Sequence, residues 1–542
     1  MFRFLASHWW ATFIILFFPL IVMYGYADFI RESELNARLG WLIMIGGLAY
    51  LLRHTLLQKF LILLLALFVV SGALDILYAV TFGGVFTSAS FEALVETDQG
   101  ESVEFLMAYA GLENLLILSI YLVLAYMALR QLMVKSPANI WRKVAIVLGM
   151  LMLILAIQQI DQRGRTFDVI PGFAGKAIDY TSGRESVEAL VTKRVENYQN
   201  ATFQAVKGVE APHTLIIVIG ESMNRNHLGV YGYPRNTTPQ LNKNRDQLIV
   251  FENTVSAYSQ TKPSLSVALT EVDAGEVDRS DQVMSLMEVF KKAGYKTWWI
   301  SNQQPSRYPT TPMAALADER HFISHDFYGV ESYRYDGYMT PYIEQALQDT
   351  SSHKVIFVHL MGSHLHYESR YPEETFSKFS TRDNLRAFLA SSELSDAQIE
   401  TINQYDNSIY YTDSLLGDWI EKLTKASNNH AAALVFFADH GEEVFDSRDF
   451  KGHAPDGVTR HMVDIPHLVW RNQAYQREFS SVNQSMQDQV TQPFLLDDFF
   501  HFAICVAQIK TDLYKPERSV CDASFKPKAR IIYGKAYEEY LD

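Results

Sequence analysis

Residues 214–222 read TLIIVIGES, an unbroken apolar run that is followed at once by Gly220, Glu221 and Ser222. Continuous Ile, Val and Phe runs of this kind are typical of strands in a sheet that is covered on both faces. Similar runs alternate with helical patterns from His213 onward, which predicts a doubly wound α/β domain. Further strands are predicted at Thr297–Ile300, Lys354–His359, Ala432–Ala438 and His467–Trp470, and helices at Gln282–Ala293, Ser395–Lys425 and Gln492–Ala507.

The first third of the chain differs, because apolar stretches there approach the roughly 20 residues that a transmembrane helix needs. Five are predicted as spans, at Trp10–Ala27, Leu39–Leu52, Phe60–Phe82, Glu113–Leu132 and Val144–Ile160. Lys and Arg gather in the loops after the second and fourth spans and are absent from 83–112. Basic loops stay in the cytoplasm, so the N-terminus is predicted inside and everything after about residue 162 outside. The spans contain few ionisable residues that could mark a transport pathway, with Asp75 as the main exception, and this argues against a transporter.

The formal net charge of −14 argues against a nucleic-acid partner, because binding to phosphate backbones needs clusters of Lys and Arg. Fourteen of the 16 His residues lie after residue 200, and His is the commonest metal ligand; soluble domains also carry more His than membrane helices do. The two cysteines, Cys505 and Cys521, are expected to form a disulfide if the second domain lies outside the cytoplasm. The alternative is two reduced structural thiols.

These patterns divide the chain into a transmembrane domain at 1–162, a connector at 163–212 and a second domain at 213–542. Within the connector, residues 186–198 repeat apolar side chains at helical spacing. This predicts an amphipathic helix that lies either on the membrane surface or against the second domain.

Carboxylates and an imidazole directly follow two of the predicted strands. Glu221 comes after the first run, and Asp439 and His440 come after Ala432–Ala438. Sites in open α/β sheets form at the carboxyl ends of strands, and these side chains are good ligands for Zn²⁺, which prefers four. We therefore predict that the three residues bind a metal ion and leave a fourth position for a nucleophile or substrate. The alternative for Glu221 is a structural helix cap.

Thr261, in the run SQTKPS at 259–264, is the candidate for that fourth position. Pro263 suits the first turn of a helix, which places Thr261 at a helix N-terminus, where backbone N–H groups favour a phosphate. A hydroxyl is a weak nucleophile until a metal or base lowers its pKa; the alternative is a structural N-cap. His364, which follows another strand, and His453 are candidates to hold phosphate oxygens or protonate a leaving group.

The run GES at 220–222, followed by LGVYGYPRNTTP at 228–239, resembles the bacterial phosphoethanolamine transferases that modify lipopolysaccharide. These enzymes belong to the sulfatase and alkaline phosphatase superfamily. The similarity continues through GSH at 362–364, RYP at 370–372, YDNSIY at 405–410, DHGE at 439–442 and residues 463–470. With the membrane spans included, it covers essentially the whole chain. The resemblance implies an α/β/α sulfatase-like catalytic domain in the periplasm, attached to a five-helix anchor in the bacterial inner membrane.

The resemblance also implies roles for individual residues. The family's zinc ligands fall on Glu221, Thr261, Asp439 and His440, with Thr261 as the nucleophile that becomes phosphoethanolaminylated; one zinc ion is expected and a second is left open. His364 and His453 match two histidines that contact phosphate. Thr97 and Glu101 resemble a motif in a loop that faces the active site, where acidic groups would hold the ethanolamine ammonium.

Two departures from the family pattern bear on the acceptor. Members that modify lipid A usually flank the nucleophile with cysteines, where this chain has Ala257 and Val267. They also carry an Asn four residues before the loop Thr, where this chain has Ala93. Both differences make a core sugar or a glucan more credible as the acceptor.

The sequence thus predicts a zinc-dependent phosphoethanolamine transferase with phosphatidylethanolamine as donor. The expected acceptor is an envelope glycolipid, either the lipopolysaccharide core or lipid A, and the expected intermediate is a phospho-threonine at Thr261. The alternatives are a related glycerol-phosphate transferase or phosphodiesterase, transfer to a periplasmic glucan, and a non-catalytic membrane scaffold.

Overall fold

The computed structural model describes residues 2–27, 32–52, 55–82, 86, 91, 111–132, 143–144, 146–151, 187–303, 310–323, 335–381, 394–427 and 430–540. The chain forms two compact units, Met1–Arg184 and Glu185–Asp542. This division falls inside the predicted connector, and each unit is described by itself below.

The first unit is helical. Its helices are α1 (Phe2–Ala27), α2 (Glu32–Leu51), α3 (Leu56–Phe82) and α6 (Leu112–Leu132), with further helical residues at 143–144 and 146–151. Two segments, Leu56–Phe82 and Leu112–Arg130, are long and apolar enough to cross a membrane, and Thr12–Tyr26 is a shorter apolar helix. The remainder of the fifth predicted span lies outside the described residues, so five spans stay a prediction.

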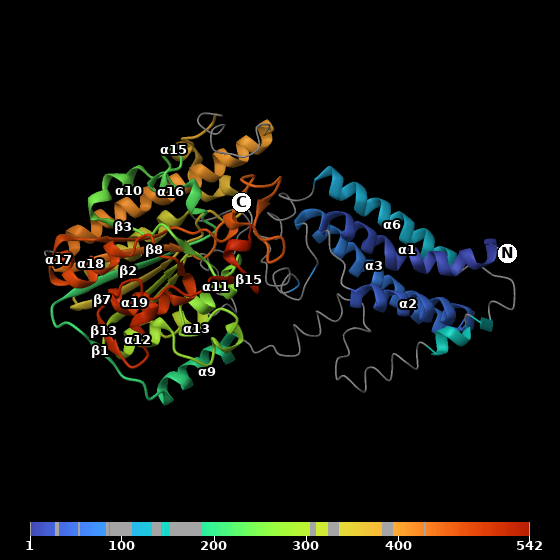
Figure 1. Ribbon diagram of the computed structural model, residues 1–542, viewed down its shortest axis with the longest axis horizontal. Coiled ribbons are helices and arrows are strands. Elements are labelled where there is room, and N and C mark those ends of the chain that lie inside the picture. The colour runs from blue at the N-terminus through green and yellow to red at the C-terminus, as the bar shows by residue number, and fades with distance from the viewer. Residues whose placement is uncertain are drawn as a thin grey trace. The chain divides into compact units, whose positions relative to one another are not determined.

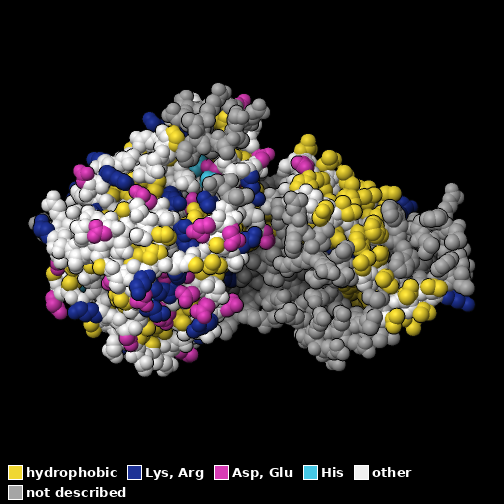
Figure 2. All heavy atoms as spheres, viewed as in Figure 1, with side chains coloured by type: hydrophobic (Ala, Val, Ile, Leu, Met, Phe, Trp, Pro, Cys, Tyr) yellow, Lys and Arg dark blue, Asp and Glu magenta, His cyan; other side chains and the backbone are white. Residues whose placement is uncertain are grey.

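Packing in this unit joins α1, α2, α3 and α6. Asp75 of α3 is buried and pairs with Arg38 of α2 at 2.9 Å, and the Tyr121 hydroxyl of α6 donates to the carbonyl of Ile15. The ionisable residue noted in the sequence is therefore neutralised by a neighbouring helix. Figure 2 shows hydrophobic side chains gathered on the visible face of these helices, whereas charged side chains are spread over the second unit.

A seven-stranded sheet organises the second unit, in the order β3-β11-β8-β2-β7-β5-β6. Strand β11 runs antiparallel to β3 and β8, and the neighbouring pairs from β8 to β6 are all parallel. The bounds are β2 His213–Gly220, β3 Leu248–Val250, β5 Lys296–Ser301, β6 Glu319–Phe322, β7 His353–His359, β8 Ala431–Ala438 and β11 His467–Arg471.

Helices cover both faces of this sheet (Figure 1). One face carries α10 (Pro239–Lys243), α14 (Thr340–Gln348) and α16 (Asp396–Ser427), and the other carries α12 (Leu286–Lys292), α13 (Thr310–Ala314) and α19 (Phe499–Val506). The remaining helices are α9 Val187–Asn200, α11 Thr261–Ala268, α15 Glu373–Phe376, α17 Gln473–Glu478 and α18 Ser480–Asp488. Short strands pair as β1 (Ala205–Lys207) with β13 (Ile509–Thr511), β4 (Thr254–Val255) with β12 (Phe494–Leu495), β9 (Glu443–Val444) with β10 (Lys451–Gly452), and β14 (Ile531–Ile532) with β15 (Lys535–Ala536).

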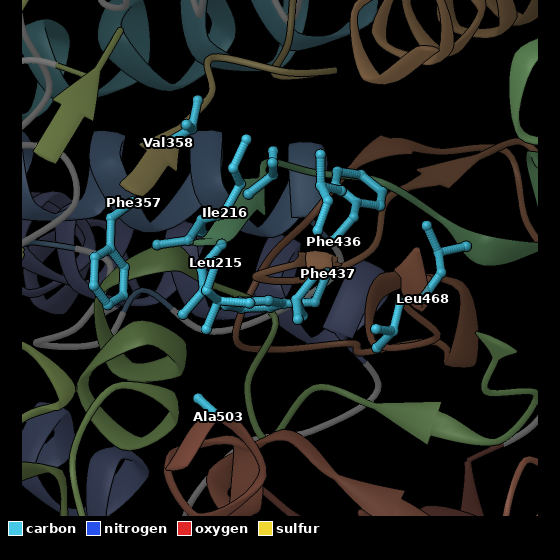
Figure 3. Close-up of a cluster of buried hydrophobic side chains, with 14 of the residues drawn as sticks. Leu215, Ile216, Phe357, Val358, Phe436, Phe437, Leu468 and Ala503 are labelled. Carbon is cyan, nitrogen blue, oxygen red and sulfur yellow. The ribbon is translucent and has the colours of Figure 1, made fainter. Parts of the chain in front are cut away.

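The central strands are buried on both sides, as their continuous apolar runs indicate. Figure 3 shows Leu215 and Phe437 on the side of Ala503 of α19, while Ile216 and Phe436 point to the opposite face. Phe437 packs against Phe499 with 4.1 Å between ring centroids. This two-sided packing leaves only the strand ends open for polar groups, which is why the chemistry gathers there.

All five predicted strands are confirmed, but the predicted helix at 492–507 is wrong over its first half. Phe494 and Leu495 form β12, which pairs with β4, and α19 begins at Phe499. Pro493 precedes this strand and cannot donate to a helix ladder, while a short apolar run alone does not separate strand from helix. The helix predicted at 282–293 begins later, at Leu286, because Ser285 and Glu288 form a capping box.

The predicted amphipathic helix exists as α9, which is part of the second unit and packs against its core. Val195 and Tyr198 contact the core of this unit. Arg194 is buried and donates to Glu288 of α12 at 2.7 Å. Of the two settings left open by the sequence, the structure therefore supports packing against the domain.

The expected disulfide between Cys505 and Cys521 is present. It connects α19 with the C-terminal segment across a sequence separation of 16 residues. A cross-link that closes a loop of this length stabilises a fold by roughly 3 kcal/mol, mainly because it lowers the conformational entropy of the unfolded chain.

Buried histidines make the second unit sensitive to acid. His467 stacks on Phe251 at 4.5 Å between ring centroids, and burial lowers the pKa of His467 to about 3. Below about pH 6.5 the imidazole of His467 binds a proton in the unfolded chain but stays neutral in the folded chain. The free energy of unfolding therefore falls as the pH falls from about 6.5 towards 3. Wild type is expected to lose unfolding free energy between pH 7.5 and pH 5, and we expect His467→Phe to make this loss smaller by about 2 kcal/mol.

Denaturant unfolding of the purified chain, followed by tryptophan fluorescence at both pH values, measures this difference. His501 is also buried, with a pKa lowered to about 3 by burial, so part of the acid sensitivity remains in the variant. An equal loss of unfolding free energy in wild type and His467→Phe contradicts the prediction.

Candidate metal centre

Parallel pairing of β2 and β8 brings the predicted ligands together. Gly220, the last residue of β2, lies opposite Ala438, the last residue of β8. Glu221 and Asp439 therefore leave adjacent strands at the same edge of the sheet. His440 follows, and all three side chains are buried.

Gly362 allows the turn after β7 to approach this edge. Its φ is +54°, and a Cβ at this position would lie 2.9 Å from the backbone N of Glu221 and 2.8 Å from its carbonyl oxygen. Only glycine fits such a close approach in a left-handed conformation. The turn is also held by Asp336, whose carboxylate accepts from the backbone N–H groups of Met361 and Gly362. His364 is thereby fixed next to the strand ends.

Glu221, Asp439, His440 and Thr261 converge on one point. His440 Nε2 lies 3.2 Å from Glu221 Oε1 and 3.5 Å from Asp439 Oδ2. Thr261 Oγ1 lies 3.2 Å from Glu221 Oε2 and 3.4 Å from His440 Nε2. The structure thus brings together all four residues that the sequence suggested as ligands.

Several details fit a cation at this point. His440 Nδ1 lies 2.8 Å from the carbonyl oxygen of Gly441, to which it can donate, and this tautomer turns the lone pair of Nε2 towards the cluster. Asp439 Oδ2 is buried and has no hydrogen-bond partner among the residues that the structure describes, although buried polar atoms are normally paired. Two carboxylates and an imidazole are ligands that Zn²⁺ accepts.

The electrostatics of the cluster also favour positive charge. Burial and the nearby carboxylate of Glu221 raise the pKa of Asp439 to about 6. Burial disfavours the charged form of His440, but the carboxylates of Asp439 and Glu221 outweigh it and raise the pKa of His440 to about 10. The buried carboxylates therefore stabilise a cation in their midst, and a metal ion would compete with the imidazole proton.

Thr261 begins α11, as predicted, and neighbouring hydroxyls fix this helix to the metal-binding edge. Ser264 of α11 donates to the carbonyl oxygen of Asp439 at 2.6 Å, and the Ser256 hydroxyl donates to the same oxygen. Thr261 therefore enters the cluster from a helix that is tied to one of the predicted ligands.

His364 and His453 lie beside the cluster. The ring of His453 is 4.1 Å from that of His440 and 6.2 Å from that of His364, centroid to centroid. Within the described part of the chain, Nδ1 of His364 is buried without a hydrogen-bond partner, and burial lowers the pKa of His364 well below its usual value. Both imidazoles are thus neutral at pH 7, since burial also lowers the pKa of His453 to about 3.

Some residues around the cluster carry no individual prediction from the sequence. Glu442, which is buried, lies 2.7 Å from His453 Nδ1 and accepts from the Tyr367 hydroxyl. Gln303 donates to the carbonyl of Leu360 and to Glu221. Glu442 stands in the DHGE run and could have been chosen from it, whereas no pattern marks Gln303. Thr97 and Glu101 lie outside the described residues.

The fold and the cluster define a class of protein: residues 213–509 match the Sulfatase family. The curated relatives are more specific. "Phosphoethanolamine transferase EptC" of Escherichia coli K12 is 32% identical over 493 residues, covering 85% of this chain and 82% of the relative. "Phosphoethanolamine transferase CptA" of Salmonella typhimurium is 30% identical over 488 residues, with the same coverage of both chains. The chain belongs to the phosphoethanolamine transferases of the sulfatase family.

Solved structures agree with this assignment. The C-terminal periplasmic domain of Escherichia coli EptC in complex with Zn has a TM-score of 0.57 and 32% identity, covering 63% of this chain and 96% of that one. The integral membrane lipooligosaccharide phosphoethanolamine transferase A of Neisseria meningitidis has a TM-score of 0.66 over 95% of this chain and 98% of that one. At 16% identity the second likeness concerns the fold alone, and it spans both units.

Proposed function

We propose that this protein transfers phosphoethanolamine from phosphatidylethanolamine to an envelope glycolipid through a phospho-threonine at Thr261. The observation that carries this proposal is the position of the Thr261 hydroxyl, 3.2 Å from Glu221 Oε2 and 3.4 Å from His440 Nε2. A hydroxyl at a helix start, beside buried carboxylates, is placed to act as a nucleophile once a cation is bound.

Glu221, Thr261, Asp439 and His440 are the proposed zinc ligands. Bound there, zinc would lower the pKa of the Thr261 hydroxyl and neutralise charge on the phosphoryl oxygens. The Zn complex of the Escherichia coli EptC domain supports this choice of metal. One ion is proposed at these four residues.

In the first half-reaction, Thr261 Oγ1 attacks the phosphorus of the lipid headgroup. A bond forms between this oxygen and phosphorus, the bond from phosphorus to the glycerol oxygen breaks, and diacylglycerol leaves with the hydroxyl proton. His364 and His453 are proposed to donate hydrogen bonds to the phosphoryl oxygens, where charge is concentrated in the transition state. In the second half-reaction an acceptor hydroxyl or phosphate attacks the same phosphorus and regenerates the Thr261 hydroxyl.

We further propose five membrane spans with the N-terminus in the cytoplasm and the catalytic domain in the periplasm. The distribution of Lys and Arg supports this orientation, and the two long apolar helices support membrane insertion. Thr97 and Glu101 are proposed to contact the ethanolamine. The acceptor is proposed to be the lipopolysaccharide core, with Ala257 and Val267 at the positions where lipid A-modifying relatives carry cysteines.

Transfer from defined lipids tests the proposal. We expect full-length protein with zinc to release diacylglycerol from phosphatidylethanolamine and to add the mass of phosphoethanolamine to core lipopolysaccharide. Lipid A and a periplasmic glucan, offered separately, serve as competing acceptors, and phosphatidylglycerol as a competing donor. Transfer of glycerol phosphate from the second donor alone, read by mass spectrometry, contradicts the proposal.

A further inference from the structure

A segment that follows the sulfatase match packs against α11, the helix that begins with the proposed nucleophile Thr261. Strands β14 and β15, joined by Tyr533 and Gly534, form a hairpin at residues 531–536, which we call the C-terminal hairpin. Figure 1 shows β15 beside α11, and Ile532 packs with Val267 of α11 in one buried cluster. The family match ends at residue 509, so this hairpin lies beyond the matched residues.

The turn of this hairpin has an unusual residue in it. Tyr533 has a φ of +46° and Gly534 a φ of +81°, and Ile532 pairs with Lys535. A two-residue hairpin turn with positive φ at both positions is normally built from Asn, Asp or Gly. A tyrosine in a left-handed conformation is strained, and strain of this kind is retained where the side chain has a task.

The Tyr533 side chain meets the segment that leads into Thr261. Its hydroxyl accepts from the backbone N–H of Ser259 at 3.3 Å and lies 3.3 Å from the Ser259 hydroxyl. Ser259 is buried, and its hydroxyl donates to the carbonyl of Ala454 at 2.7 Å. Tyr533 thus contacts Ser259, two residues before Thr261, and Ser259 in turn contacts Ala454, the residue that follows His453.

The C-terminal hairpin is itself firmly anchored. The Tyr540 hydroxyl donates to the carbonyl of Ile532 at 2.6 Å, and the Tyr537 hydroxyl donates to Asp464 at 2.7 Å. Asp464 also pairs with Arg225 at 3.1 Å. These contacts give Tyr533 a fixed base from which to hold its partners.

We propose that the C-terminal hairpin is a positioning element. Through Tyr533 and Ser259 it holds Thr261 and His453 in a fixed position relative to each other. The inference rests on the proposed function, because it takes Thr261 as the nucleophile. Attack on phosphorus requires the two reacting atoms to be held close and aligned, and small displacements of a nucleophile cost rate steeply. Tyr533 acts through Ser259, so its loss changes the rate of the chemical step.

Two matched substitutions provide the test. Tyr533→Phe removes the hydroxyl that contacts Ser259, and Tyr514→Phe removes a hydroxyl that donates to Asp522, a contact between two residues outside the hairpin. Full-length wild type and both variants, loaded with zinc in detergent micelles, are compared in single-turnover labelling by phosphatidylethanolamine and in amide hydrogen exchange at Ser259. Melting temperature and zinc content check that each variant is folded and loaded.

We expect Tyr533→Phe to slow labelling about tenfold without changing the KM for the lipid, and to speed exchange at the Ser259 amide. Tyr514→Phe is expected to label within about twofold of wild type, since a substitution away from the reacting groups and from the hairpin has a small effect. Equal labelling rates and equal exchange in the two variants overturn the inference. If wild type is not labelled at all, the proposed function fails; the exchange comparison then decides the inference alone, and unchanged exchange at Ser259 in Tyr533→Phe overturns it.

Discussion

Thr261→Ala is expected to abolish transfer, with a loss of at least about 10³-fold in the rate of diacylglycerol release, the scale on which removal of a nucleophile acts. The reason is the geometry of the cluster: the Thr261 hydroxyl lies 3.2 Å from Glu221, and alanine leaves no oxygen that can attack phosphorus. Incubation with a donor labelled in its ethanolamine, followed by peptide mass spectrometry, locates the label.

A matched control separates the hydroxyl from the rest of the side chain. Thr261→Ser keeps the oxygen and loses only a methyl group, so we expect labelled serine at position 261. The next residue, Lys262, carries no hydroxyl, and the Ser264 hydroxyl already donates to the carbonyl of Asp439, so neither replaces the lost oxygen. Label retained in Thr261→Ala, on any residue, rules out the proposed nucleophile.

Asp439→Asn is expected to lower zinc affinity by at least about 100-fold, because loss of the groups that merely orient ligands already costs about 10–100-fold. Asp439 Oδ2 is buried, and none of the described residues forms a hydrogen bond with it; the amide would bring either a weaker ligand atom or an unpaired donor to that point. Metal content after dialysis against a chelator of known affinity measures the change, and activity is expected to fall with it.

The control for this substitution is Asp449→Asn. Asp449 is ten residues further along the chain and accepts from Gln398 at 2.6 Å on the exposed side of the domain. The substitution changes the net charge by the same amount, and we expect unchanged zinc content. Full zinc occupancy in Asp439→Asn at chelator concentrations that leave the control loaded contradicts the proposed site.

The main parts of the fold and of the cluster were predictable because the signals were local. Strands β2 and β8 are continuous apolar runs, and each ends in the polar residues that later meet. Because parallel strands end at the same edge of the sheet, Glu221 and Asp439 were expected at one edge, whereas the direct pairing of β2 with β8 is known only from the structure. Thr261 was found in the same way, from a proline two residues later.

Contacts that join distant segments were not predictable. The Arg194–Glu288 pair that fixes α9 to the domain links residues 94 positions apart, and nothing in the apolar pattern of α9 marks an arginine as buried. Strand β6, with the sequence Glu-Arg-His-Phe, lies at the edge of the sheet and has no apolar run. Gln303 and Tyr533 reach the site through loops, whose conformation depends on the folded surroundings.

The distance along the chain between the proposed ligands has a consequence for biosynthesis. Thr261 and His440 are 179 residues apart, so a ribosome finishes one of them long before the other. Until β8 has been made and has paired with β2, no part of the growing polypeptide offers this coordination sphere. The proposed site therefore implies an order of maturation: a cation bound by these four residues would be acquired only after β8 has paired with β2, in the compartment where that folding takes place.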